Sequence, residues 1–223
     1  LELDIYLPEI GLAIEFNGVY WHSENFGKSK KYHLDKTNKC QDKGIRLIHI
    51  FEDQWIKKND ICKSIIRLSV GNPEYKYNAR DLILREVGSK EANLFLKDNH
   101  IQGSRGAQAA IGLYKGSTLV SVMTFGKSGF DNKYGWELIR YAVANNSIIN
   151  GGAKKLFSYF VDTYNPYNVV CYSDRSLFSG NIYTNLGFTF DGYTQPNNWY
   201  ITGNKNTLKR THRLGYTKKA MIK

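Results

Sequence analysis

The residues best suited to chemistry lie near the start of the chain, where two carboxylates fall in short apolar segments. Asp4 belongs to an alternating segment over 1–7, Glu15 belongs to a second one over 12–16, and His22 follows shortly after. Carboxylate oxygens are the ligands that Mg²⁺ prefers, and a histidine takes up a proton near neutral pH. The pattern predicts a hydrolase of phosphodiester bonds that uses Mg²⁺ or Mn²⁺, with Asp4 and Glu15 as metal ligands and His22 as general base.

Two cations follow on a predicted helix over 31–43, where His33 and Lys36 share one face at i and i+3. Either side chain can stabilise negative charge that develops on a scissile phosphate. The alternative is that this face is solvated, and that Asp4 and Glu15 are strand acids that face solvent. His49, inside an apolar segment, is interpreted as structural.

A small α/β unit over residues 1–70 has to position these groups. Strands are predicted at 1–7 and 12–16, joined by a turn, and a third apolar strand at 45–51 follows the helix, which ends at Gly44. An amphipathic helix is predicted over 53–70. Residues 71–78 have the composition of a linker.

A second, α+β domain is predicted over 79–223. Its elements alternate between apolar strands and amphipathic helices, with a hairpin turn at 115–117. We predict strands at 82–87, 107–114, 118–125, 136–142, 169–173, 188–193 and 198–202, and helices at 89–98, 152–164 and 180–186.

The positive charge is unevenly distributed. The net charge is +11, yet the first 75 residues carry 11 basic and 11 acidic side chains, so the whole excess lies in the second part. Such a field favours a phosphate backbone, and DNA is the expected partner. The predicted DNA-binding residues are Lys154, Lys155, Arg175, Lys209, Arg210 and Arg213. The alternative for the basic tail is that it only aids solubility. Trp199 and Tyr200 are interpreted as core residues rather than base-stacking ones.

Membrane and disulfide classes are disfavoured. No apolar run approaches the length of a membrane span, so no membrane partner is expected. Cys40, Cys62 and Cys171 are far apart and odd in number, which favours reduced thiols in a cytoplasmic protein over a zinc site or a disulfide framework. The chain begins with Leu1, and we expect it to be truncated at its N-terminus.

Residues 1–56 are similar to a known nuclease core. The strings over 14–24, 32–37 and 43–52 resemble the very-short-patch-repair endonucleases and the related phage homing endonucleases of the PD-(D/E)xK superfamily. The resemblance implies that Asp4 binds the metal, that Glu15 is the second-strand acid and that His22 activates water. Asn17 replaces the lysine of the E-x-K motif, and Lys36 is the candidate to supply that charge.

The mismatch-repair branch also has a structural zinc site, for which this chain lacks clustered Cys and His. The homing or phage branch is therefore favoured, in a phage-infected or bacterial host cell.

Residues 79–202 resemble GNAT acetyltransferases, through the strings at 150–153, 172–174 and 183–188. In a working member, backbone amides at the helix start near Gly151 and Ala153 would hold acetyl-CoA. Ile148 stands where that family has a basic or amide residue, and a nucleic-acid role is more economical for so basic a domain.

The favoured function is therefore that of a metal-dependent DNA endonuclease of phage or homing type. Two alternatives stay open: an acetyltransferase with an N-terminal targeting module, and a catalytically inactive DNA-binding protein. Double-strand cutting from one active site would need two protomers or two binding events, so a homodimer is possible.

Overall fold

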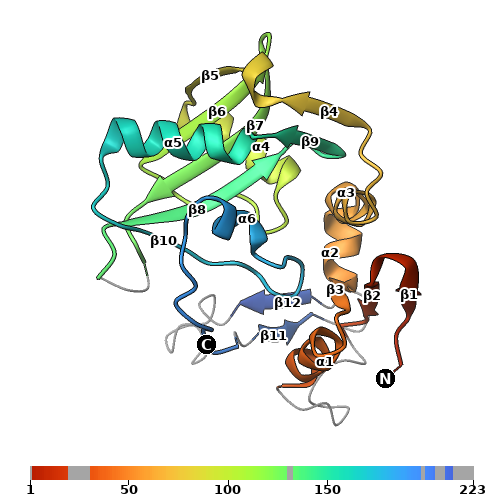
Figure 1. The fold of residues 1–223 in the computed structure, drawn as a ribbon. Coiled ribbons are helices and arrows are strands. Elements are labelled where there is room, and N and C mark those ends of the chain that lie inside the picture. Colours follow the sequence, from red (N-terminus) through yellow and green to blue (C-terminus); the bar gives the residue numbers. More distant parts are fainter. Residues whose placement is uncertain (1, 20–30, 130–132, 197–198, 204–208, 213–223) are drawn as a thin grey trace. The chain divides into compact units, whose positions relative to one another are not determined.

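The computed structural model describes residues 2–19, 31–129, 133–196, 199–203 and 209–212 (Figure 1). This part of the chain is a mixed α/β structure, which confirms the predicted class. Residue contacts divide the chain into two compact units. The first unit comprises residues 1–59, 175–179 and 190–223, and the second comprises 60–174 and 180–189.

The first unit contains a three-stranded sheet in the order β1-β2-β3, formed by β1 (Ile5–Leu7), β2 (Leu12–Asn17) and β3 (Arg46–Phe51). β1 and β2 are antiparallel, and β2 and β3 are parallel. The 3₁₀ turn η1 (Pro8–Ile10) joins the hairpin and ends at Gly11, whose φ of 58° suits glycine. β1 is shorter than the predicted strand over 1–7.

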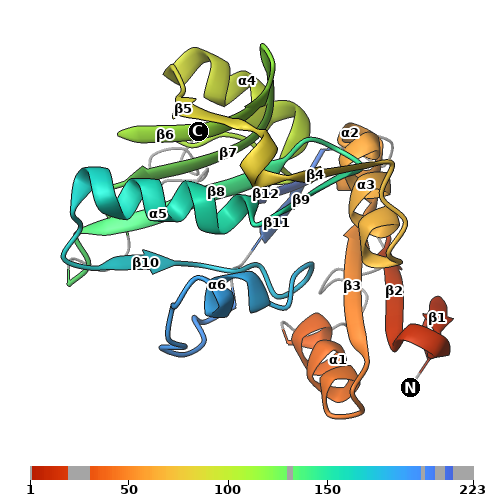
Figure 2. The ribbon, with the colours of Figure 1, turned by 45° about the horizontal axis from the view of Figure 1, so that its top comes forward.

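A crossover through α1 (Tyr32–Gln41) connects the parallel strands β2 and β3, as parallel pairing requires (Figure 2). The helix packs on the sheet through Cys40, which is fully buried with Ala13 and Leu47. The chain turns back at Gly44, whose positive φ of 70° ends the helical segment near the predicted residue.

The predicted helix over 53–70 is two helices, α2 (Glu52–Lys57) and α3 (Asn59–Ser69). The chain leaves the helical region at Lys58, with φ −137° and ψ 43°. The contact division falls at this break, between residues 59 and 60, rather than at the predicted linker. Part of that linker is the strand β4 (Tyr75–Asn78), which pairs in parallel with β9 (Ser147–Asn150).

The sequence predicted that the C-terminal strands belong to the sheet of the second domain, and this prediction is wrong. β11 (Trp199–Thr202) and β12 (Lys209–His212) form their own antiparallel pair and belong to the first unit. Residues 188–193 contain no strand. Trp199 and Tyr200 are about half exposed, so the interpretation as core residues is wrong.

The second unit is built on a five-stranded sheet in the order β10-β8-β7-β6-β5. All neighbours are antiparallel except β10, which is parallel to β8. These strands confirm five predicted ones. They are β5 (Ile83–Glu86), β6 (Ala109–Lys115), β7 (Thr118–Gly126), β8 (Trp136–Val143) and β10 (Val169–Cys171).

Helices cover both faces of this sheet (Figure 2). On one face α5 (Gly152–Tyr164) buries Leu156 and Phe160, and the Phe160 ring stacks on Phe125 with centroids 3.6 Å apart. On the other face α4 (Ser89–Asn99) buries Leu96 against Tyr114. The remaining elements of the unit are the turn η3 (Ala79–Asp81) and the short helix α6 (Asn181–Asn185).

None of the helices in the described ranges has the length and apolar composition needed to cross a bilayer. The three cysteines are free thiols, with Cys40 and Cys62 buried and Cys171 half-buried. Burial raises the pKa of Cys171 to about 12, so this thiol is protonated and unreactive at neutral pH.

Candidate active site

The face of the first unit's sheet that α1 covers carries a row of polar side chains. Alternation along the strands places Glu15 and Asn17 of β2, and His49 of β3, on the same face as buried Ala13 and Leu47. The matching stripe of α1 has the spacing i, i+3, i+4, i+7 and consists of His33, Lys36, Thr37 and Cys40. The interface is apolar around Cys40 and becomes polar toward the carboxyl ends of β2 and β3.

Glu15 and Lys36 form a buried ion pair between β2 and α1. The Lys36 ammonium contacts Glu15 Oε1, and the side chains are only 5% and 11% exposed for Glu15 and Lys36, respectively. The second carboxylate oxygen, Glu15 Oε2, is buried and has no hydrogen-bond partner among the described residues. The alternative of a solvent-facing acid is therefore wrong for Glu15, which has one oxygen left for a further ligand.

Asp4 lies beside Glu15 on the hairpin. Its Oδ2 accepts a hydrogen bond of 2.8 Å from the backbone N–H of Phe16, the residue after Glu15. The β1–β2 register begins with the pair Ile5 and Ile14, and the chain bends at Asp4, just before it. This bond ties Asp4 to β2 beyond the end of the paired register. Asp4 itself is exposed.

A chain of hydrogen bonds runs from β2 through β3 to α1. Asn17 Nδ2 lies 3.2 Å from His49 Nδ1, and His49 Nε2 lies 2.9 Å from Thr37 Oγ1. The Thr37 hydroxyl also donates to the His33 carbonyl at 2.9 Å. This series of hydrogen bonds agrees with the structural interpretation of His49. It gives His49 Nδ1 a partner in Asn17 and His49 Nε2 a partner in Thr37. Thr37 was not predicted to belong to the site, although its i+4 spacing from His33 can be read from the sequence.

The His33 ring is packed on the same face. Its centroid lies 5.2 Å from that of Phe51 and 5.4 Å from that of His49, both in edge-on geometry. The structure thus brings His33 and Lys36 to the sheet-facing side of α1. His22 lies outside the described residues. The last described residue before it is Val19, whose N–H donates to Glu52 Oε2 at 3.0 Å.

The described residues contain no group of three or more His, Cys, Asp or Glu side chains that could hold a metal ion. Asp4 and Glu15 nevertheless fit a hard divalent cation in donor type, because both are carboxylates and Glu15 Oε2 is a buried acceptor without a partner. Further ligands would have to come from other oxygens, water or a phosphate.

The predicted DNA-binding cations differ in their surroundings. Lys154 and Lys209 are exposed. The Lys155 ammonium instead donates to the carbonyls of Ala79 and Leu82, both at 2.8 Å, and thereby fixes the η3 turn. Arg213 lies outside the described residues.

The two arginines are tied into the first unit by its own side chains. Arg175 donates to Asn38 Oδ1 at 3.0 Å and to Gln41 Oε1 at 2.9 Å on α1. Arg210 Nε donates to Asp53 Oδ1 at 3.0 Å, and its guanidinium lies 3.5 Å above the Phe51 ring. Both hold segments distant in sequence together, a role that the run of basic residues did not reveal.

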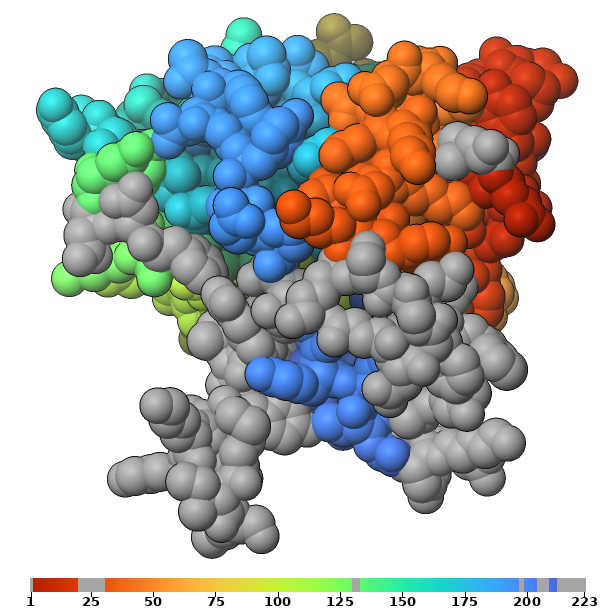
Figure 3. Space-filling model, turned by 90° about the horizontal axis from the view of Figure 1, so that it is seen from below, coloured from red at the N-terminus to blue at the C-terminus, as the bar shows by residue number. Residues whose placement is uncertain are grey.

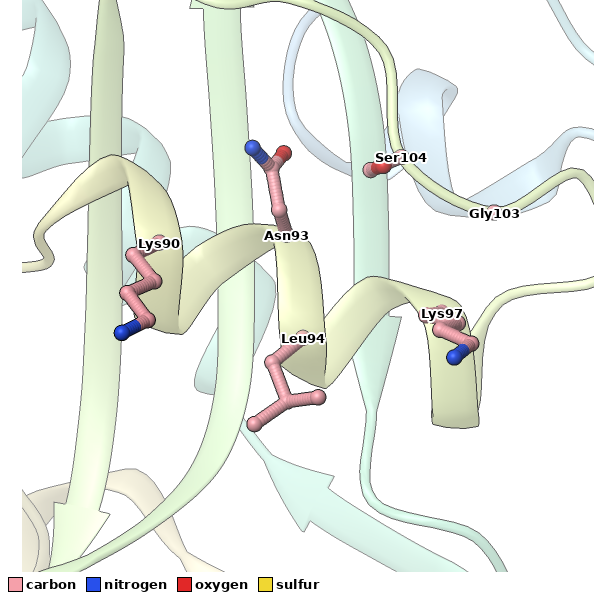
Figure 4. Close-up of a pocket in the computed structure, with 6 residues that line it drawn as sticks. All are labelled: Lys90, Asn93, Leu94, Lys97, Gly103 and Ser104. Atoms are coloured by element: carbon pink, nitrogen blue, oxygen red, sulfur yellow. The ribbon is translucent and has the colours of Figure 1, made fainter.

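The surfaces of the two units differ in what they offer a ligand. Figure 3 shows the residues of α1 (orange) and of the N-terminal strands (red) side by side at the surface of the first unit. In the second unit an open hollow of about 370 Å³ lies against α4 (Figure 4). Its lining provides two ammonium groups but no carboxylate, thiol or imidazole, so it can contact phosphates but has no general acid–base pair. The lining residues are Lys90, Asn93, Leu94, Lys97, Gly103 and Ser104.

No family model matches the chain, and no curated protein is significantly similar to it. Function is therefore inferred from the geometry of the residues themselves.

Proposed function

We propose that this protein is a Mg²⁺-dependent DNA endonuclease of phage or homing type, with the cutting site in its first unit. The observation that supports this most is the buried Glu15 carboxylate, which has Lys36 on one oxygen and no described partner on the other. A buried acceptor left unpaired costs about 1–3 kcal/mol. A bound cation would remove that cost, which gives a functional reason for keeping the group.

The arrangement around Glu15 also supports the proposal. An antiparallel hairpin, a crossover helix and a parallel third strand form the small mixed sheet that the resemblance to PD-(D/E)xK nucleases implies. Asp4 is held next to the Glu15 segment by its hydrogen bond from the Phe16 N–H, which supports the two acids as ligands of one cation. Lys36 reaches Glu15 from α1, so a cation is present beside the acid although the strand position of the motif's lysine is Asn17.

In the proposed mechanism Asp4 and Glu15 would hold the metal, which would polarise the scissile phosphate and acidify a nearby water. His22 accepts the proton of the attacking water. Lys36 is placed to release Glu15 to the metal and to stabilise negative charge on the phosphate, with His33 as the second candidate for that role. The α1 stripe keeps both side chains on the sheet-facing side of the helix.

The second unit is proposed to bind DNA. Its sheet of four antiparallel strands, with β10 parallel to β8 across the helix α5, supports a GNAT-like fold reused for binding. Exposed ammonium groups at Lys90, Lys97 and Lys154 offer contacts to a phosphate backbone. An acetyltransferase has less support, because Ile148 stands where that family has a basic or amide residue.

The test is nicking of supercoiled plasmid DNA with and without Mg²⁺. We expect the wild type to nick only with the metal. Asp4→Ala and His22→Ala should lower the rate by about 10²-fold or more, with DNA affinity nearly unchanged. Glu9→Ala, which removes an exposed acid of the same hairpin, is the matched control and should cut normally. Full cleavage by Asp4→Ala would refute the site.

A further inference from the structure

We propose that the amide oxygen of Asn17 is a further ligand of the divalent cation beside Glu15, and that His49 is the residue that positions it. This inference rests on the proposed function, because it concerns the same site. It assigns a metal-binding role to the residue that stands in place of the motif's lysine.

Asn17 has the same anomaly as Glu15. The residue is fully buried, and its Oδ1 has no hydrogen-bond partner among the described residues. Asn17 and Glu15 are two positions apart on β2, so their side chains leave the same face of the strand. Two buried oxygen acceptors with no described donor thus lie on the same face of β2, two residues apart. Both Mg²⁺ and Mn²⁺ take carboxylate and carbonyl oxygens of this kind.

The hydrogen-bond chain sets which end of the Asn17 amide faces His49. The Thr37 hydroxyl has one proton, which it donates to the His33 carbonyl, so it must accept from His49 Nε2. The neutral imidazole then has its lone pair on Nδ1, which accepts from Asn17 Nδ2. A flipped amide would bring two acceptors together, and Asn17 Oδ1 is therefore held away from His49.

Charge balance explains why an amide suits this position. Lys36 already provides one cation to Glu15 from α1. A lysine at position 17 would add a second buried cation on the same face and would repel a divalent ion. A neutral amide provides an oxygen ligand without adding charge, whereas an aspartate there would provide an oxygen with a negative charge.

The test measures Mn²⁺ binding to the full chain without DNA, by the electron paramagnetic resonance signal of the free ion. Asn17→Ala should weaken Mn²⁺ binding by at least about tenfold. Asn17→Asp should bind Mn²⁺ at least as tightly as the wild type, because a carboxylate oxygen replaces the amide oxygen. Asn59→Ala is the matched control, since the Asn59 amide donates to the Trp55 carbonyl, and should be unchanged. Circular dichroism confirms that each variant is folded.

The positioning role of His49 has its own arm. His49→Leu should weaken Mn²⁺ binding several-fold, whereas His49→Gln, which keeps a side-chain acceptor for Asn17 Nδ2, should restore most of it. If loss of stability alone explained these results, Asn17→Asp would weaken binding as much as Asn17→Ala does.

The outcomes separate this inference from the proposed function. If the wild type binds Mn²⁺, Glu15→Gln loses it and the Asn17 variants stay within twofold of the wild type, Asn17 is not a ligand and the nuclease proposal stands. If the wild type binds no Mn²⁺, both proposals are overturned.

Discussion

In the part of the chain that the structure describes, each compact unit buries one glutamate, and the two glutamates differ in how completely they are paired. Glu137 of the second unit is 3% exposed, with Oε1 2.6 Å from Arg105 Nη1 and Oε2 3.2 Å from the N–H of Gly129. Glu15 of the first unit is 4% exposed, yet only Oε1 has a described partner, Lys36. Both oxygens of Glu137 have a partner, whereas only one oxygen of Glu15 has a partner among the described residues.

The surroundings of the two glutamates differ in the kind of polar group that is buried. The second unit fully buries Phe125, Leu156 and Phe160, and its buried polar atoms without a described partner, such as Thr124 Oγ1, belong to neutral groups. The buried face of the first unit's sheet carries Glu15, Asn17 and His49 beside only a few apolar residues. A folding core alone does not need such groups, because burying polar atoms costs free energy unless they are paired. What sets the first unit apart is that a buried atom without a described partner belongs to a carboxylate, which supports an interior arranged for a ligand.

The largest expected effect on stability comes from removing the cation of each pair. Lys36→Met leaves a buried charge on Glu15 and should lower the free energy of unfolding by about 3–5 kcal/mol. Arg105→Met should cost about 1 kcal/mol, because the Arg105 side chain is 37% exposed and Gly129 still donates to Glu137. Urea unfolding of both variants measures the two values. Equal losses would remove the distinction between the pairs.

Metal linkage should separate the glutamates next. At Mn²⁺ concentrations of about 100 times the dissociation constant, bound metal should stabilise the wild type by about 2.7 kcal/mol. Glu137→Gln should keep this increment although the variant is less stable, and Glu15→Gln should lose it. Thermal unfolding with and without Mn²⁺ provides the measurement. If only Glu137→Gln lost the stabilisation by Mn²⁺, the metal would bind in the second unit, contrary to the proposal.

Arg210 tests whether a basic residue is structural or binds DNA. Arg210→Ala breaks the pair with Asp53, whose side chain is only 11% exposed, and should cost about 2 kcal/mol. The slope of log DNA affinity against log salt should not change, whereas loss of a phosphate contact lowers it by about one. Lys154→Ala is the comparison, with little effect on stability and a reduced slope.

The smallest effect concerns alkaline pH and the second unit. Burial raises the pKa of Tyr141 to about 12, above its usual 10, because the hydroxyl is held protonated in the folded state. The stabilisation is complete below pH 10 and declines as pH rises toward 12, since the unfolded chain loses the proton first. The urea midpoint should therefore fall less between pH 9 and pH 11 in Tyr141→Phe than in the wild type. An unchanged difference would contradict the assignment.

Local patterns predicted much of the fold. The hairpin, the crossover helix, the third strand and the elements of the second sheet each follow from hydrophobic period and turn residues. The break at Lys58 and the pairing of β4 with β9 were not predicted, because neither has a local signal. The place of the C-terminal strands depends on a contact between Asp53 and Arg210, which are 157 positions apart.

The candidate site, like the fold, could be predicted only where a local sequence pattern positions the residues. Glu15, His33 and Lys36 could be predicted to share a surface, since strand and helix periods put them there. The basic side chains that are available to bind DNA could not be predicted, because the partners of Arg175 and Lys155 come from distant segments. That Glu15 Oε2 lacks a partner among the described residues depends on the whole face and has no counterpart in a sequence motif.

The central claim is that Glu15 and Lys36 are buried for chemistry rather than for stability, and the double variant Glu15→Gln/Lys36→Met tests it most directly. Replacing both members of a buried ion pair is often neutral or stabilising. We predict that this variant unfolds at a urea concentration equal to or above that of the wild type, yet nicks no supercoiled DNA in Mg²⁺. A double variant that is well folded and still cuts at the wild-type rate would contradict the account.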